Sequence, residues 1–284
     1  MISLKTAYYY ILAVKINLIK IFKKVYFKTG FYKKSLNSNI PIQFFFFPNP
    51  FLMSSFSNYK KFAFRINSLD PEKFWDQNHS TKEKKELHNF LWLSSIDRKD
   101  DASTLRKIIS LWNQRNLKYK SLIWETSIIS KRIMSWILNA DIILKNSNFG
   151  FKRDFIESII IQTHHLKKNF IYETDQQKKI EVITTLILSG LVFKEYEENY
   201  EYGIKELEKL IDIFFDDYGF PLTRSPSDLL NFTKYFLLIK EVIKDAQKYA
   251  PDFLESILEK NLECLKQITT PANSLPLFNG SIED

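Results

Sequence analysis

The polar side chains that could do chemistry are concentrated in one short stretch, residues 215–230. An apolar segment with helical periodicity runs into this stretch, and another runs out of it. Carboxylates, a tyrosine and an arginine are groups from which acid–base and anion-binding sites are built. We therefore predict that the stretch lies at the functional site, with these candidates: Asp216, Asp217, Tyr218, Arg224, Ser225 and Asp228.

The same residues also have a structural interpretation. The run 225–228, Ser-Pro-Ser-Asp, fits a helix start, with Ser225 as the N-cap and proline at the first helical position. Asp228 would then accept a hydrogen bond from the backbone N–H of the cap, which completes a capping box. For Ser225 and Asp228 the sequence leaves both capping and catalysis open.

The composition favours a helical protein without a disulfide framework. Of 284 residues, 45% are hydrophobic, enough for a sizeable core, and only 6 Gly and 9 Pro argue against a strand-and-turn architecture. Cys264 is the single cysteine, so an intrachain disulfide and a cysteine-based zinc site are excluded. The histidines have no metal-ligand spacing, so we expect no metal and no cofactor: His79, His88, His164 and His165.

Helical periodicity dominates the chain after residue 80, so the fold class predicted is all-α. Gly190 lies inside one helical pattern, where glycine costs about 1 kcal/mol relative to alanine. We expect close packing against another helix to compensate for this cost. Connections of roughly 3–8 residues predict antiparallel neighbouring helices. The expected helices are 81–96, 103–114, 127–145, 153–170, 177–193, 200–217, 226–249 and 251–269.

Two segments are expected to precede the helical domain of residues 81–284. Residues 29–80 form an irregular, aromatic-rich arm, because the run 44–50 has no helical period and its prolines oppose one. We expect the aromatics of this arm to be buried against the helices. Residues 62–66, in which Phe62, Phe64 and Ile66 alternate with other residues, suggest a short extended segment.

Residues 1–28 read as a basic amphipathic helix. Its longest uncharged run, residues 6–14, is too short to span a bilayer, and no small-residue cleavage site follows it. Such a helix either docks on the protein body or lies on a membrane surface, and residues 1–25 would make the membrane contact. The formal charge of +8 attracts anions, although lysine enrichment typical of AT-rich coding sequence also explains it. No nucleic-acid recognition motif accompanies the charge, so we expect no nucleic-acid partner.

Several motifs, in order over about residues 40–280, resemble the N-terminal half of heparinase II/III-type polysaccharide lyases. The Tyr218-Gly219 turn that leads into Arg224-Ser225-Pro226 resembles an Asp-Gly-x-x-x-x-x-Ser-Pro element of the family. The run 275–280 resembles the end of the same domain in an α-proteobacterial subset. The other matching segments are 87–93, Trp112, Trp124, 130–136 and 188–193.

The resemblance implies an incomplete α/α toroid of antiparallel helical hairpins around a cleft. In the family a β-sandwich domain closes the cleft, and we expect this chain to be truncated or to have a separately encoded sandwich partner. The implied compartment is the periplasm or cell envelope, although the chain has no clear signal peptide. The implied chemistry is β-elimination beside a uronic acid, in which the carboxylate is neutralised, a base removes the C5 proton, and an acid protonates the leaving oxygen.

The resemblance also assigns catalytic positions, and the sequence departs from the family at each of them. The Asn-His pair of the family falls on Gln177 and Lys178, and its tyrosine falls on Asp228. Lys178 could neutralise a carboxylate, and Tyr218 is the nearest substitute tyrosine. Gln177 and Lys178 are equally consistent with solvated residues at a helix start.

The substrate-binding candidates have structural alternatives as well. Trp92 and Trp124 are either sugar-stacking platforms or core residues, because each lies on an apolar stripe. Arg132 either faces the cleft or pairs with Glu125 or Asp141. His88 is expected to be a hydrogen-bonded structural histidine. By resemblance alone, these residues also line the cleft: Arg224, Asn279 and Glu283.

The function expected from this sequence is that of a toroid domain acting on an acidic, uronic-acid polysaccharide. A lyase would result if a sandwich domain completed it, and by itself the chain is expected to be weak or inactive because the family's catalytic residues are replaced. The alternative is a non-catalytic carbohydrate-binding or scaffold protein, associated with a membrane surface through its N-terminal helix.

Overall fold

The computed structural model describes residues 10, 14, 18–19, 21–36, 39–56, 70–76, 79–98, 102–270, 274–279 and 281. The described part is built from helices, and its β pairing is confined to an isolated bridge between Phe215 and Pro221. Residues 21–26 are also helical. The elements are α2 (Gly30–Leu36), η1 (Pro50–Phe56), α3 (Pro71–Phe74), α4 (Thr81–His88), η4 (Leu91–Ser95), α5 (Ala102–Asn116), α6 (Thr126–Leu138), α7 (Ala140–Leu144), α8 (Phe149–Asn169), η5 (Phe170–Tyr172), α9 (Gln176–Val192), η6 (Lys194–Tyr196), α10 (Glu197–Phe214), α11 (Pro226–Asp245) and α12 (Asp252–Ile268).

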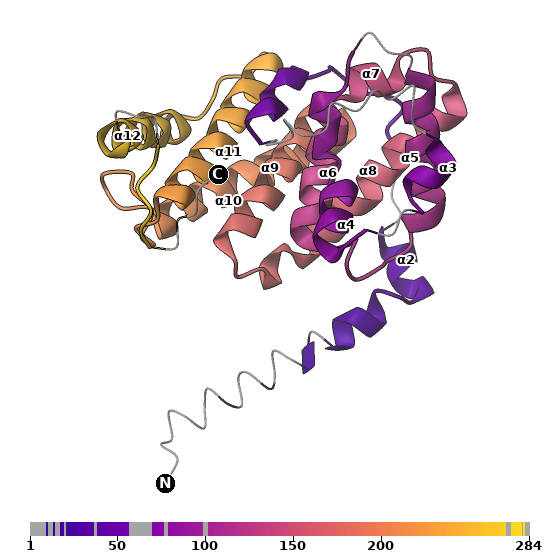
Figure 1. Ribbon diagram of the computed structural model, residues 1–284, viewed down its shortest axis with the longest axis horizontal. Helices are drawn as coiled ribbons and strands as arrows, with labels where there is room; N and C mark the ends of the chain where they lie inside the picture. The colour runs from indigo at the N-terminus through magenta and orange to yellow at the C-terminus, as the bar shows by residue number, and fades with distance from the viewer. Residues whose placement is uncertain are drawn as a thin grey trace.

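Helix α9 is the centre of the fold. Every residue from Ile180 to Val192 is buried, and α9 packs against α6, α8, α10 and α11. In Figure 1 the later helices α10–α12 lie on one side of α9, and the earlier helices α5–α8 lie on the other. The residues of this stretch are mainly apolar on every face, and such a helix is stable in water only when other helices surround it. The sequence of α9 therefore requires this central position.

Gly190 allows α9 and α10 to approach closely. A Cβ atom built on Gly190 would lie 2.2 Å from the backbone nitrogen of Tyr200 in α10. That distance is far below van der Waals contact, so only glycine fits between these two backbones. The close helix packing expected for Gly190 is therefore confirmed.

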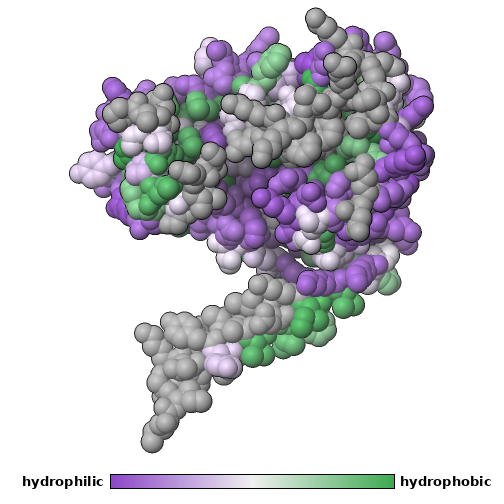
Figure 2. Space-filling model, in the orientation of Figure 1, coloured by the Kyte–Doolittle hydropathy of each residue, from purple (hydrophilic) through white to green (hydrophobic). Residues whose placement is uncertain are grey.

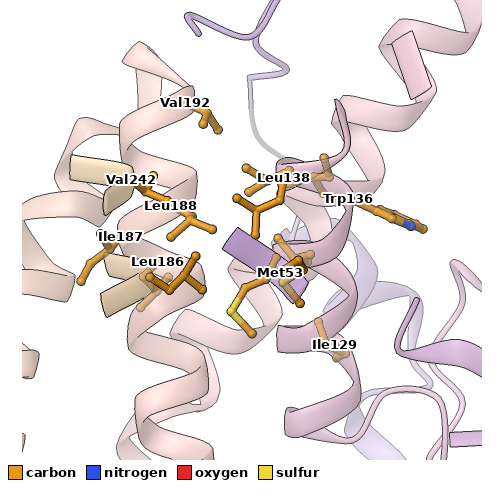
Figure 3. Close-up of a cluster of buried hydrophobic side chains, with 14 of the residues drawn as sticks. Met53, Ile129, Trp136, Leu138, Leu186, Ile187, Leu188, Val192 and Val242 are labelled. Atoms are coloured by element: carbon orange, nitrogen blue, oxygen red, sulfur yellow. The ribbon is translucent and has the colours of Figure 1, made fainter. Parts of the chain in front are cut away.

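Part of the predicted arm contributes to the core. Met53 of η1 is fully buried and lies between α6 and α9 (Figure 3). The backbone N–H of Phe45 donates a hydrogen bond to the carbonyl of Val192, at 2.8 Å, and Phe44 is buried. The expectation that the arm aromatics are buried is wrong for four phenylalanines that are 50–82% exposed: Phe31, Phe45, Phe47 and Phe51. The alternating segment that contains Phe62, Phe64 and Ile66 lies outside the described residues.

Two expected helices are interrupted at asparagines. The helix predicted from residue 81 to Ile96 ends at His88, because Phe90 has a left-handed backbone (φ 60°) and the Asn89 side chain accepts from the N–H of Leu91, at 2.8 Å. The helix predicted over 127–145 is divided into α6 and α7 at Asn139, whose side chain donates to the Ser135 carbonyl at 2.9 Å. Asparagine side chains compete with the backbone for hydrogen bonds in this way.

The apolar residues of the N-terminal helical segment are exposed rather than docked. Phe22 is 71% exposed and Val25 is 62% exposed, and the segment projects from the body (Figure 1). Its base is packed on the body, where the Phe27 ring lies 4.6 Å from Tyr32 and 5.1 Å from His165, between ring centroids. The boundaries predicted at residues 28 and 80, between the N-terminal helix, the arm and the helical domain, stay predictions.

Among the described residues, no helix combines the length and the apolar content that crossing a membrane requires.

Candidate functional site

A cavity of about 350 Å³ lies where the N-terminal ends of α9 and α11 approach the middle of α6. The arm closes one wall through η1, and η4 contributes one residue. Two of the four predicted catalytic residues, Gln177 and Asp228, line this cavity. The lining residues are Ser55, Phe56, Leu91, Lys131, Gln177, Glu181, Asp228, Asn231, Lys234 and Tyr235.

Gln177 and Asp228 contact each other at the rim of the cavity. The Gln177 Nε2 donates to Asp228 Oδ1 at 2.9 Å, across 51 residues of sequence. The hydroxyl of Thr223 donates to the other carboxylate oxygen, Oδ2, at 2.7 Å. Each carboxylate oxygen of Asp228 thus accepts a side-chain hydrogen bond, which holds the group in one orientation. The structure thus brings two of the predicted catalytic residues into contact.

The capping prediction is right in one half and wrong in the other. Ser225 is the N-cap of α11, and its hydroxyl accepts from the backbone N–H of Asp228 at 3.3 Å. The Asp228 carboxylate does not return a bond to the cap, because Gln177 and Thr223 occupy it. The N–H of Ser225 instead donates to the Thr223 hydroxyl at 3.4 Å. The side chain of Asp228 therefore belongs to the cavity rather than to a capping box.

The floor of the cavity is a buried acid held by a lysine and a tyrosine. Glu181 of α9 is 6% exposed, and its Oε1 lies 3.2 Å from Lys131 Nζ of α6. The Tyr235 hydroxyl of α11 donates to the same oxygen at 3.3 Å, while Glu181 Oε2 is buried without a hydrogen-bond partner among the described residues. Burial, with the negative charge of Glu181, raises the pKa of Tyr235 well above its ordinary value. This phenol stays protonated at neutral pH.

Two polar side chains of the wall remain available to a ligand. Lys234 and Asn231 of α11 line the cavity, and neither forms a hydrogen bond or ion pair with any described residue. Both carboxylates of the cavity are already partnered by Lys131, Tyr235, Gln177 and Thr223. Lys131 is paired with Glu181, and the partners of Asp228 are neutral, so the cavity retains the carboxylate of Asp228 and the ammonium of Lys234. The ammonium of Lys234 is the group that suits an anion.

Tyr218 and Arg224 do not line this cavity. The Tyr218 side chain is 82% exposed on the connection between α10 and α11. Asp216 organises this loop, because its carboxylate accepts from the backbone N–H groups of Tyr218 and Phe220, at 3.0 and 2.9 Å, and pairs with Arg224. Burial raises the pKa of Asp216, but these hydrogen bonds and the guanidinium outweigh it and leave the pKa below its ordinary value.

The loop itself is tied to α12 and to the end of the described chain. The left-handed turn at Gly219 (φ 82°) brings its backbone against Lys260, where a Cβ atom would clash at 2.4 Å. Asn279, which the resemblance placed in the cleft, donates through Nδ2 to the Arg224 carbonyl at 3.0 Å. These contacts give Asp216, Arg224 and Asn279 structural roles in the loop. Glu283 lies outside the described residues.

Lys178 is directed away from the cavity. It follows Gln177 on α9, so its side chain leaves the helix about 100° further round. Its ammonium lies 3.4 Å from the Asp175 carboxylate, and Asp175 also caps α9 by accepting from the N–H of Gln177 at 3.0 Å. Lys178 is therefore a solvated residue at the start of α9, which is one of the two interpretations predicted for it.

The two tryptophans predicted to stack on sugars lie in the core. Trp92 is 1% exposed, with its ring centroid 5.3 Å from that of Phe74, and its indole N–H donates to the Leu87 carbonyl at 3.0 Å. Trp124 is 4% exposed, and its N–H donates to the Asn116 carbonyl at 3.0 Å. A buried ring has no open face for a ligand, so the stacking role is corrected to a packing role.

Arg132 is fully buried and pairs with neither Glu125 nor Asp141. Its guanidinium donates to Gln162 Oε1 at 2.7 Å, to the His88 carbonyl at 2.8 Å and to the Ile123 carbonyl at 3.2 Å. It also lies 4.3 Å above the Trp112 ring. Glu125 pairs with Lys85 instead, and Asp141 pairs with Arg98. Neither the proposed pairs nor the proposed cleft contact is present, because neutral acceptors surround this arginine.

The histidines are held in hydrogen bonds within the fold. His88 accepts at Nδ1 from the Trp112 indole N–H at 2.9 Å, as expected for a structural histidine. His165 Nδ1 lies 2.6 Å from the Tyr32 hydroxyl. Burial lowers the pKa of each imidazole to about 3. Within the part of the chain that the structure describes, no group of three potential metal-ligating side chains occurs.

A second hollow, of about 550 Å³, lies beside α3, α4 and α5. Two of its basic groups are used in local contacts. Arg115 pairs with Asp76 at 2.7 Å, and Lys120 donates to the Asn116 side chain at 3.0 Å. None of the residues predicted to be catalytic lines this hollow. The cavity between α6, α9 and α11 is therefore the better candidate.

The sequence analysis did not predict five of the polar residues of the candidate site. For three of them, the spacing along the helix from a predicted residue indicates the position. Glu181 follows Gln177 by four residues, so both lie on one face of α9. Asn231 and Tyr235 follow Asp228 by three and seven residues, which places them on one face of α11. Continuing each helix face from the predicted residue would have identified these positions. The residues missed are Lys131, Glu181, Asn231, Lys234 and Tyr235.

Comparison with known proteins identifies one solved structure with a similar fold. It is heparan sulfate lyase HepC from Pedobacter heparinus, with a TM-score of 0.53 and 18% sequence identity. The match covers 70% of this chain and 32% of that one, so this chain spans about a third of the lyase. No protein-family model matches the sequence, and no curated protein matches it either. The chain therefore has a polysaccharide lyase-like fold, and the predicted all-α class with an incomplete α/α toroid is confirmed.

Proposed function

We propose that the cavity between α6, α9 and α11 binds an acidic, uronic-acid polysaccharide. The observation that carries this proposal is the convergence of Gln177, Asp228 and the unpaired Lys234 in one cavity of a polysaccharide lyase-like fold. The similar lyase acts on heparan sulfate by its name, and fold similarity at 18% identity does not transfer its substrate. The substrate class rests on the chemistry of the cavity.

The arrangement of charges supports an anionic sugar. An incoming carboxylate can accept hydrogen bonds from Lys234 Nζ and from the Asn231 amide, which has no other partner among the described residues. The adjacent sugar hydroxyls can donate to Asp228, whose carboxylate retains acceptor capacity beyond its two existing bonds. The Lys131 ammonium neutralises Glu181, so the buried acid repels the ligand less than a free carboxylate would.

The same geometry explains why we propose weak or absent cleavage by this chain alone. β-Elimination requires a base near the C5 proton after the carboxylate has been neutralised. The tyrosine in the cavity, Tyr235, is protonated and donates to Glu181, so it is a poor base. The two carboxylates of the cavity are engaged in the fold, since Asp228 is held by Gln177 and Thr223 and Glu181 is buried beside Lys131. We propose that a β-sandwich domain, encoded separately or on the same longer protein, supplies the missing acid–base groups.

We expect Lys234→Ala to weaken binding of an acidic polysaccharide by roughly 10- to 150-fold, because one charge-assisted contact is worth roughly 1.5–3 kcal/mol. The measurement is isothermal titration calorimetry of the full chain with alginate, hyaluronan and heparan sulfate. Lys244→Ala is the matched control, because Lys244 lies on the exposed surface of the same helix. Equal affinities of the two variants would contradict this site.

The same polymers distinguish the two functions proposed for the cavity. Unsaturated uronate ends, detected by their ultraviolet absorbance, report β-elimination. Binding without this absorbance supports a carbohydrate-binding or scaffold protein, and rapid turnover by the chain alone would contradict the proposal of weak activity. If none of the polymers binds, the proposed substrate class is wrong.

A further inference from the structure

The N-terminal helical segment presents an apolar stripe that no described residue covers. Its large apolar side chains are 38–74% exposed, in contrast to the buried apolar residues of α9. At 100° per residue, six of them fall within an arc of roughly 120° on a helix. In Figure 2 the described apolar residues form a hydrophobic surface that stands clear of the helical body. The stripe consists of Tyr10, Val14, Leu18, Ile21, Phe22 and Val25.

Exposed lysines lie within this segment and on α2, which follows it. Lys24, Lys28, Lys33 and Lys34 are exposed and form no ion pair with a described residue. Lys23 is held by neutral groups, because it donates to Asn169 Oδ1 at 3.3 Å and lies 3.2 Å above the Tyr172 ring. Positive charge beside an apolar face is complementary to a surface that is anionic outside and apolar beneath.

The base of the segment is anchored, which sets its position on the body. Phe27 packs between Tyr119 and His165, with ring centroids 5.0 and 5.1 Å away. A hollow of about 570 Å³ beside this anchor is lined by both apolar and basic side chains, including Phe22, Lys23 and Lys168. Ile171, which is 82% exposed, follows on η5 close to this hollow. The apolar and basic surface thus continues from the segment onto the body.

We propose that this segment docks the protein on an anionic lipid membrane surface. The apolar stripe would enter the boundary between headgroups and acyl chains, and the lysines would remain among the anionic headgroups. This proposal is independent of the polysaccharide cavity, which lies between α6, α9 and α11.

Other occupants fit the observations less well. An acidic polysaccharide would neutralise the lysines but leave the apolar stripe in water. A second copy of the chain would cover the stripe but would bring Lys24 and Lys28 near the same lysines of its partner. An anionic membrane satisfies both features at once.

The test is flotation of the full chain with vesicles of phosphatidylcholine alone or mixed with phosphatidylglycerol. We expect binding to the mixed vesicles that weakens as salt is added, because surface charges are screened. Ile21→Glu should reduce this binding by at least tenfold. Ile213→Glu, which makes the same change at an exposed isoleucine of α10, should leave it unchanged. Lys28→Glu should reduce it by more than about fivefold, since each lysine near an anionic surface contributes about that factor.

Three results would overturn the proposal. The first is failure of the full chain to float with the mixed vesicles. The second is equal binding by the Ile21→Glu and Ile213→Glu variants. The third is a dimer in light scattering that Ile21→Glu dissociates, without lipid binding, which would identify the occupant as a second copy. Polysaccharide binding by Ile21→Glu should be unchanged, so failure of this proposal can be told apart from failure of the cavity proposal.

Discussion

Replacing Gly190 with alanine is expected to lower the free energy of unfolding by about 3 kcal/mol or more, the upper end of the overpacking range. The added Cβ would lie 2.2 Å from the backbone nitrogen of Tyr200 and 2.8 Å from its Cα. Because both neighbours are backbone atoms of α10, no side-chain rotation relieves the clash, and α9 and α10 must separate. α9 is the central helix, so its other contacts would be strained as well. Chemical denaturation followed by far-ultraviolet circular dichroism measures this loss.

Two other glycines provide a graded control. A Cβ at Gly203 of α10 would meet Cγ1 of Ile187 at 2.6 Å, a side-chain atom that can shift, so Gly203→Ala should cost less than Gly190→Ala. A Cβ at Gly150 of α8 would lie 3.5 Å from the Asn148 side chain, an ordinary contact, so Gly150→Ala should be neutral or stabilising by up to about 1 kcal/mol. If Gly190→Ala were as stable as Gly150→Ala, the close contact of α9 and α10 would be disproved.

The protein is expected to lose roughly 3 kcal/mol of stability between pH 6.5 and pH 5, because two buried histidines must stay neutral in the folded state. Burial lowers the pKa of His88 and of His165 from 6.5 to about 3. Below pH 6.5 the unfolded chain binds a proton at each imidazole, whereas the folded protein does not until about pH 3. Each histidine therefore destabilises the fold by an amount per pH unit that rises to about 1.4 kcal/mol as the unfolded imidazole becomes fully protonated. The measurement is the free energy of unfolding in urea at a series of pH values.

The double variant His88→Asn with His165→Asn tests the cause of this acid sensitivity. An asparagine Oδ1 can take the place of Nδ1 and accept from the Trp112 N–H or the Tyr32 hydroxyl. The variant has no titrating imidazole at either position, so its stability should depend much less on pH over the same window. An unchanged slope in the variant would show that carboxylates rather than these histidines cause the loss.

The arrangement of helices followed largely from local patterns. Apolar residues at helical spacing marked most of the helices, and Ser225 marked the start of α11, because these interactions act between residues close in sequence. Gly190 predicted a close contact between helices, because the free-energy cost of a glycine inside a helix is typically offset by close packing. The breaks at Asn89 and Asn139 were missed, because their side-chain hydrogen bonds compete with a periodicity that continues through them.

The candidate site was predictable only in part. Gln177 and Asp228 were identified by resemblance, and the structure shows them in contact at the cavity. The floor of the cavity was not predicted, because Lys131, Glu181 and Tyr235 come from three helices that meet only in the folded protein.

Tertiary packing also decided which predicted residues face a ligand. Periodicity assigns a side chain to a helix face, but the contacts of that face depend on the angle and distance of the helices packed against it. Arg132 therefore binds carbonyls and an amide where carboxylate partners were expected, and Trp92 lies in the core. Tyr218 is exposed because Asp216 holds its loop away from the cavity. Local sequence thus specifies the helices and the close contact of α9 and α10 at Gly190. The set of polar residues in the cavity between α6, α9 and α11 arises from long-range packing around α9.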